Sequence, residues 1–187
     1  FFALLLIYTL SKQSKINFIN LLINLSLISI FIESTYILLI FFDNIIINGE
    51  SFIRANIYKG FTANINIAAF SLAAKSPAVF YYIYNSKKLI NKSLGGILIF
   101  MLMSCLWIIL SRGAFIAFAF IVILMITYSI LKRVNNFIIS SSILILPILI
   151  SYLIFSNIIV SGDDNLINQR VSSIQIDRED DSIDQRL

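Results

Sequence analysis

The sequence has 187 residues, of which 59% are hydrophobic and 13% charged, and its mean hydropathy is +0.92. Soluble domains average about 45–50% apolar and about 25% charged residues, and a chain of this length has too little interior to bury so much apolar surface. The composition therefore excludes a water-soluble globular domain and indicates an integral membrane protein. The net charge of +4 suggests anionic partners, but its placement matters more than its sum, and we expect no nucleic-acid partner.

The two ends of the sequence predict a piece of a longer protein. The chain starts without methionine inside an apolar run, FFALLLIYTL, and stops at DQRL. The single cysteine, Cys105, lies within an apolar run and indicates nothing about redox compartment. We therefore expect an internal fragment, with further segments outside it.

Apolar runs long enough to cross a bilayer follow one another along the chain. A spanning helix needs about 20 mostly apolar residues, and continuous rather than alternating runs exclude the strands of a barrel. We expect an all-α, polytopic transmembrane helix bundle of about six spans over residues 1–155, followed by the start of an outer loop at 156–187. The expected spans are a partial one at 1–10 and fuller ones at 18–42, 65–84, 94–110, 114–131 and 137–155.

Charge in the connecting segments predicts the orientation. Short loops rich in Lys and Arg stay in the cytoplasm. Three segments, SKQSK, NSKKLINKS and KRVNN, carry only positive charges and alternate with the other connections; these charges are Lys12, Lys15, Lys87, Lys88, Lys92, Lys132 and Arg133. The segments 43–64, 111–113 and 156–187 are therefore expected to face outward.

Two opposite charges, Glu33 and Lys75, fall inside expected spans, where each costs about 2.5–3.5 kcal/mol at a helix centre. Each lies roughly nine or ten residues from the outer end of its span, or about 14–15 Å at the helical rise. Opposite charges at one depth on antiparallel neighbours can form an ion pair that holds the two helices in register. The alternative is a direct role in a substrate path or a proton relay.

Arg112 is the third charge that is hard to place in lipid, and it lies in the stretch LSRGAF between two spans. Ser111 is a candidate N-cap for the following helix, and Gly113 permits a close approach. The first N–H groups of a helix lack internal partners, so a guanidinium beside them forms an anion site suited to phosphate oxygens. The alternative is an arginine that extends to lipid headgroups.

The outer segment GESFIRANIYKGFTANINIAAF adds the cations Arg54 and Lys59, with Asn64 at an expected helix start. Asn64 is interpreted as an N-cap, and Tyr58 and Phe61 as interfacial aromatic residues. With the turn arginine, these cations favour an anionic ligand at the outer face, and the residues that we expect to bind the substrate there are Arg54, Lys59, Asn64 and Ser111. The sequence has no Gly-rich phosphate loop and no His, so we expect neither a metal nor another cofactor.

Three motifs in order resemble the O-antigen ligase-like membrane protein family: KGFTANINIAAFSLAAKSPAVFYY, LSRGAF and DDSIDQRL, within residues 58–187. The resemblance implies a metal-independent glycosyltransferase of the bacterial inner membrane. It would move a glycan from undecaprenyl diphosphate to a lipid A core, glycan or protein acceptor at the periplasmic face. Arg112 matches the family's turn arginine and Arg186 the arginine of its outer-loop element. The family's ligases use an outer-loop His as base, which this sequence lacks.

Other functions stay open at this point. An O-antigen polymerase of the same family shares the chemistry, and its acceptor-selecting loops lie outside this sequence. A transporter or flippase subunit would use Glu33 and Lys75 as a coupling pair, and a membrane scaffold or sensor would bind a partner through the tail. A large outer loop containing His downstream would favour the enzyme.

Overall fold

The computed structural model describes residues 18–47, 56–131 and 137–162. Every element in these ranges is a helix, which confirms the all-α prediction for this part of the chain. The elements are α2 (Phe18–Phe42), the π-helix η1 (Asp43–Ile47), the 3-10 helix η2 (Asn56–Lys59), α3 (Ile65–Asn85), α4 (Leu89–Ile109), α5 (Arg112–Leu131) and α6 (Phe137–Gly162). The span expected at 1–10 lies outside the described residues.

The helix boundaries differ from the predicted spans by more than one residue at three places. α4 begins at Leu89 rather than at 94, so that Lys92 belongs to the helix and not to a basic loop. α5 begins at Arg112, which shortens the expected turn at 111–113. α6 continues to Gly162, past the predicted end at 155, because the apolar stretch NIIV extends the run.

Four of the described helices are long and apolar enough to cross a membrane, over Phe18–Ile45, Leu89–Ile109, Arg112–Leu131 and Phe137–Phe155. α3 has a similar length, but Asn66, Lys75 and several serines and tyrosines lower its hydropathy. These apolar helices are compatible with a membrane-embedded protein. The predicted count of about six spans is not confirmed.

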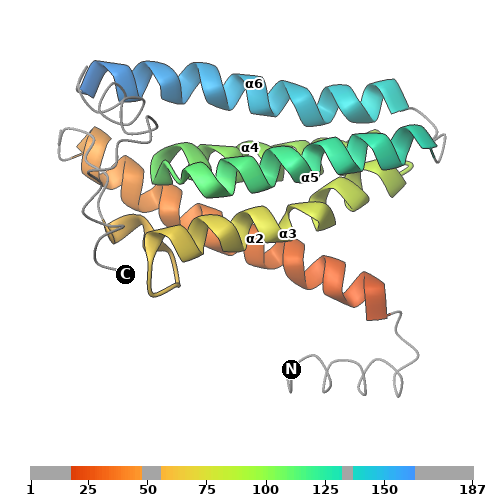
Figure 1. Ribbon diagram of the computed structural model, residues 1–187, viewed down its shortest axis with the longest axis horizontal. Helices are drawn as coiled ribbons and strands as arrows, with labels where there is room; N and C mark the ends of the chain where they lie inside the picture. The colour runs from red at the N-terminus through yellow and green to blue at the C-terminus, as the bar shows by residue number, and fades with distance from the viewer. Residues whose placement is uncertain (1–17, 48–55, 132–136, 163–187) are drawn as a thin grey trace, which may run out of the picture.

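α4 is the central helix of the bundle, and it packs against α2, α3 and α6. Figure 1 shows α6 on one side of α4 and α5, with α2 and α3 on the other. The fully buried side chains of α4 include Ile99, Leu102 and Leu106. Although α5 follows α4 directly, its main packing partner is α3, so the chain's last three helices do not form a simple row.

Adjacent glycines on α4 allow its close approach to two neighbours. A Cβ added at Gly95 would clash with Cγ1 of Ile83 on α3. A Cβ at Gly96 would lie 3.0 Å from Cγ2 of Ile143 and 3.3 Å from its carbonyl oxygen, on α6. Small residues at helix interfaces let backbones approach closely in membrane proteins. Gly95 and Gly96 therefore position α4 between α3 and α6.

Pro77 lies inside α3 without ending it. Proline has no N–H to donate to the carbonyl four residues earlier, which here belongs to Ala73. The buried Ser76 Oγ donates to that same carbonyl at 2.7 Å. The serine before the proline therefore supplies the hydrogen bond that the proline removes.

Candidate functional site

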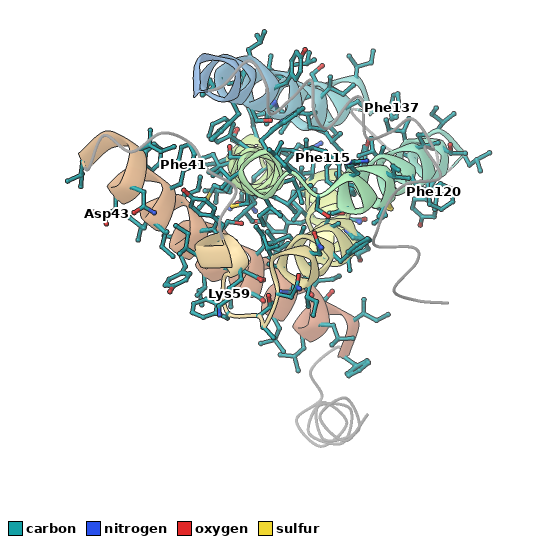
Figure 2. All side chains as sticks on the ribbon, turned by 60° about the vertical axis from the view of Figure 1, so that its left-hand side comes forward. Phe41, Asp43, Lys59, Phe115, Phe120 and Phe137 are labelled. Atoms are coloured by element: carbon teal, nitrogen blue, oxygen red, sulfur yellow. The ribbon has the colours of Figure 1, made fainter. Side chains whose placement is uncertain are left out.

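The helices alternate in direction, so their termini gather at two ends of the bundle (Figure 1). One end, here called the η2 end, contains η2, the C-termini of α2, α4 and α6, and the N-termini of α3 and α5. Figure 2 turns this end toward the viewer, with Asp43 and Lys59 on its near side. The opposite end contains the α3–α4 connection, where Lys87 and Lys88 are exposed. The segments expected to face outward thus share one end of the molecule wherever they are described.

Arg112 is the first residue of α5, and its side chain is exposed at the η2 end. α4 closes with Leu110 in the left-handed conformation, with φ 53° and ψ 39°. Ser111 is buried, and its carbonyl accepts a hydrogen bond from Phe115 N at 3.1 Å. Ser111 therefore occupies the N-cap position of α5, and the guanidinium belongs to the turn whose N–H groups have no acceptors within the helix.

The beginning of α5 is held against α3 through Gly113. A Cβ at this position would lie 2.7 Å from Cζ of Phe70, so only glycine fits without a shift of the ring. On the other side of α5, Phe115 contacts Trp107 of α4, with the ring centroids 4.7 Å apart. These two contacts fix the position from which Arg112 extends.

The segment between η2 and α3 is closed by side-chain hydrogen bonds. Thr62 Oγ1 lies 2.7 Å from the carbonyl oxygen of Lys59 and 2.8 Å from that of Asn64. Asn64 Oδ1 accepts from Asn66 N at 2.8 Å and so caps α3. Lys59 and Asn64 are both exposed. Lys59 thus lies on a folded segment at the same end of the bundle as Arg112. The side-chain oxygen of Asn64 caps α3.

The two aromatic residues of this segment differ in environment. Tyr58 is only 2% exposed and lies against Phe41, with ring centroids 6.3 Å apart, so its interpretation as an interfacial aromatic is wrong. Phe61 is 66% exposed and stacks on Tyr36 of α2, with centroids 4.8 Å apart. Tyr58 therefore anchors η2 to the bundle, and Phe61 remains at the surface.

Glu33 and Lys75 meet between α2 and α3. Lys75 Nζ donates to Glu33 Oε2 at 2.7 Å, and the side chains are 26% and 5% exposed, respectively. Gly60, at φ +60°, turns the η2 segment over the carboxylate, since a Cβ there would lie 3.4 Å from Glu33 Oε1. Glu33 and Lys75 are therefore paired, beneath the segment that carries Lys59.

Lys92 is a buried charge that the sequence analysis had placed in a loop. It is 3% exposed, and its Nζ donates to Ser140 Oγ of α6. Nearby in the sequence, Tyr84 OH lies 3.3 Å from Ser141 Oγ, which adds a polar contact between α3 and α6. The sequence did contain a signal that the helix begins before residue 94. The predicted span 94–110 is shorter than the roughly 20 residues that a helix needs to cross a bilayer.

Two of the expected site residues, Arg54 and Arg186, lie outside the described residues. The structure brings Glu33 and Lys75 into contact, and it places Lys59, Asn64, Ser111 and Arg112 at one end of the bundle. Within the described ranges, there is no group of three or more His, Cys, Asp or Glu that could hold a metal ion.

Comparison with known proteins gives no match of any kind. No family model matches the sequence. No curated protein matches it, and no solved structure matches the fold. A function for this chain therefore has to be proposed from its own residues and motifs.

Proposed function

We propose that this chain is part of a membrane glycosyltransferase of the O-antigen ligase-like kind. It transfers a glycan from undecaprenyl diphosphate to a lipid A core, a glycan or a protein at the periplasmic face of the bacterial inner membrane. The observation that carries the proposal is the position of Arg112, an exposed guanidinium on the first residue of α5. The order of the three sequence motifs supports the same assignment.

The chemistry requires stabilisation of a diphosphate leaving group. As the glycosidic bond to the lipid diphosphate breaks, negative charge grows on the departing phosphate oxygens. A planar guanidinium donates two parallel hydrogen bonds to such oxygens, and the N-terminal N–H groups of a helix add a positive potential. Preorganised donors of this kind typically contribute about 10²–10³ in rate each. Arg112 is assigned this role, with Lys59 adding positive charge at the same end.

The distribution of the other described charges supports docking of the donor at the η2 end. Lys87 and Lys88 lie at the opposite end, as the positive-inside rule requires of a cytoplasmic connection. Arg112 and Lys59 then belong to the outer face, where the rule disfavours cations. An outer-leaflet lipid diphosphate is an anion that cations at this face can bind.

Ligase and polymerase activities share this donor chemistry and differ in the acceptor. A flippase for the same lipid would also bind its diphosphate, but it breaks no glycosidic bond and so has no leaving group to stabilise. The two classes differ in where the lipid-linked glycan accumulates when the protein fails. A transferase defect leaves the glycan on the outer leaflet, and a flippase defect leaves it on the inner leaflet.

The test is complementation of a strain from which the gene has been deleted, using the full-length protein. Wild type, Arg112→Lys and the control Lys87→Gln are compared at equal protein level. Lipopolysaccharide is resolved on gels, and the lipid-linked glycan is assigned to a leaflet. We expect Arg112→Lys to lose transfer by about 10²–10³ because a point charge cannot reproduce the bidentate fork, with glycan accumulating on the outer leaflet. Lys87→Gln should transfer normally.

Full transfer by Arg112→Lys would overturn the phosphate clamp. Accumulation of the glycan on the inner leaflet would instead assign the chain to a flippase. An unchanged lipopolysaccharide ladder together with no accumulation of lipid-linked glycan on the outer leaflet of the deletion strain would remove the transferase proposal altogether.

A further inference from the structure

A pocket of about 390 Å³ opens between α2 and α3, around the ion pair. Its polar lining consists of Glu33, Lys75, Ser29, Ser71 and Thr62, contributed by α2, α3 and the segment after η2. Its apolar lining consists of Leu25, Ile28, Ile32 and Phe61, all of them large side chains on the surface of the bundle. The polar residues form the floor of the pocket, and the apolar residues connect this floor to the outer surface of the bundle.

Several polar groups on this floor lack partners. Glu33 Oε1 accepts no hydrogen bond from any described residue, although its side chain is only 5% exposed. The hydroxyls of Ser29 and Ser71 likewise make no hydrogen bond within the part of the chain that the structure describes. Lys75 uses one of its three N–H groups on Glu33. Ser29, Ser71 and Lys75 are half-exposed, so their donors and acceptors are accessible from the pocket. The pocket is therefore suited to an occupant that both donates and accepts hydrogen bonds.

The charge of the pocket selects among polar occupants. The carboxylate of Glu33 and the ammonium of Lys75 are in contact and cancel each other at 2.7 Å. An anionic group approaching Lys75 would meet the free oxygen of Glu33, and a cation approaching Glu33 would meet Lys75. A neutral group rich in hydroxyls meets neither repulsion, and it can donate to Glu33 and Ser71 and accept from Lys75.

The apolar members of the pocket define the rest of the occupant. Phe61 is 66% exposed and is braced by stacking on Tyr36, so that it presents a fixed aromatic face beside the polar floor. The C–H face of a sugar ring packs on such a surface. Leu25, Ile28 and Ile32 follow one another along α2 at helical spacing and are 44%, 56% and 50% exposed, which makes an apolar path away from the floor.

We propose that the pocket between α2 and α3 binds a membrane lipid with an uncharged sugar headgroup. The headgroup hydrogen-bonds to Glu33, Lys75 and Ser71 and packs on Phe61, and the tail lies along Leu25, Ile28 and Ile32. The inference goes beyond the proposed transferase function and stands without it, because none of its residues belongs to the diphosphate clamp.

The experiment uses the full-length protein in nanodiscs and two photoreactive probes with the same diazirine-bearing dodecyl chain. One probe carries a glucoside headgroup and the other a phosphate. Labelled peptides are mapped by mass spectrometry. We expect the glucoside probe to label the α2 segment containing residues 25–32 at least about fivefold more than the phosphate probe does. A fivefold difference in binding corresponds to the contribution of a single hydrogen bond. Excess free glucose should compete only weakly, because it lacks the tail.

Three variants test the named contacts. Ser71→Ala and Phe61→Ala should each lower glucoside labelling about fivefold without disturbing the ion pair. Phe120→Ala, which removes a comparably exposed phenylalanine (60%) from α5, should leave labelling unchanged. Glu33→Gln keeps the shape but leaves Lys75 as an unbalanced cation, so the preference should reverse toward the phosphate probe.

Equal labelling by both probes, a preference of the wild type for phosphate, or equal losses in Phe61→Ala and Phe120→Ala would overturn the proposal. Complete displacement by free glucose would overturn the assignment of the apolar path to a lipid tail. Arg112→Lys separates the two proposals, because it should abolish glycan transfer and leave glucoside labelling intact.

Discussion

Lys75 Nζ and Glu33 Oε2 lie 2.7 Å apart, although 42 positions separate the two residues in the chain. The contact joins α2 to α3 where both helices carry a charge that lipid would not tolerate alone. The side chain of Glu33 is 5% exposed and that of Lys75 is 26% exposed, so most of the pair is removed from its surroundings. Each residue therefore lowers the free-energy cost of placing the other inside the bundle, and substitution of one or both residues tests this.

Removing one partner of the pair should cost more than removing both. Glu33→Ala or Lys75→Ala leaves a buried charge without its partner, which costs about 3 kcal/mol and lowers the melting temperature by about 6–12 °C. The double variant should lose less than the sum of the two single losses. Melting curves in one detergent check this, with Lys59→Ala as the exposed control. Strictly additive losses would contradict the pairing.

The glycines of the helix contacts should differ in their tolerance of alanine. Gly95→Ala forces a methyl group against the fully buried Ile83, and this overpacking, about 1–3 kcal/mol, exceeds the roughly 1 kcal/mol gained in helix propensity. Gly113→Ala meets the tip of Phe70, a ring that is 47% exposed and free to move. We expect Gly95→Ala to destabilise the protein and Gly113→Ala to be nearly neutral in melting experiments. The reverse order would refute the described packing of α4 against α3.

Ser76 and Pro77 should be energetically coupled. Ser76→Ala leaves the buried carbonyl of Ala73 without a donor, at a cost of about 1–3 kcal/mol. Pro77→Ala restores a backbone N–H four residues after that carbonyl. In the Pro77→Ala background, Ser76→Ala should therefore cost much less. A thermal double-mutant cycle measures the coupling, and equal costs in both backgrounds would show that the serine does not replace the lost bond.

Lys92 should be replaceable by an apolar residue of similar length. Lys92 is buried, and its ammonium donates to the neutral hydroxyl of Ser140 rather than to a carboxylate, so burial costs more than this contact returns. Lys92→Met should leave the melting temperature unchanged or raise it. Ser140→Ala should destabilise the wild type but have little effect in the Lys92→Met background. Lys87→Met, on the exposed connection, is the control. A large loss in Lys92→Met would indicate that the ammonium has a further role.

Local patterns in the sequence predicted most helix boundaries but not the environment of every charge. The apolar run of α2 was delimited at Phe18 and Phe42, because polar residues flank it on both sides. Lys92 was placed in a loop because a lysine beside an apolar run is usually solvated. The one local signal of its burial was the shortness of the predicted span 94–110; its partner Ser140 is 48 positions away and cannot be identified from the local pattern.

The sequence predicted part of the candidate site, namely the contact that depends on the depth of two charges in their spans. Similar depth in antiparallel spans was sufficient to suggest contact between Glu33 and Lys75, and the structure places them together. The pocket beside them could not be predicted, since it depends on how the segment through Gly60 and Phe61 folds back onto α2. The packing of α5 on α3 rather than on α4 was also absent from the sequence analysis, because helix order along the chain does not define neighbours in space.

We propose that the η2 end, with its cations, faces the periplasm, where a lipid diphosphate can dock. The most direct measurement is labelling of Arg112→Cys in intact cells with a membrane-impermeant maleimide, with Lys87→Cys as the matched site at the opposite end. The background is the protein with any cysteine outside this sequence replaced by serine; it is the unlabelled control, because Cys105, the one cysteine of this sequence, is fully buried. Residue 112 should react in intact cells and residue 87 only after the membrane is opened. Reaction of residue 87 in intact cells, with residue 112 protected until the membrane is opened, would contradict the account.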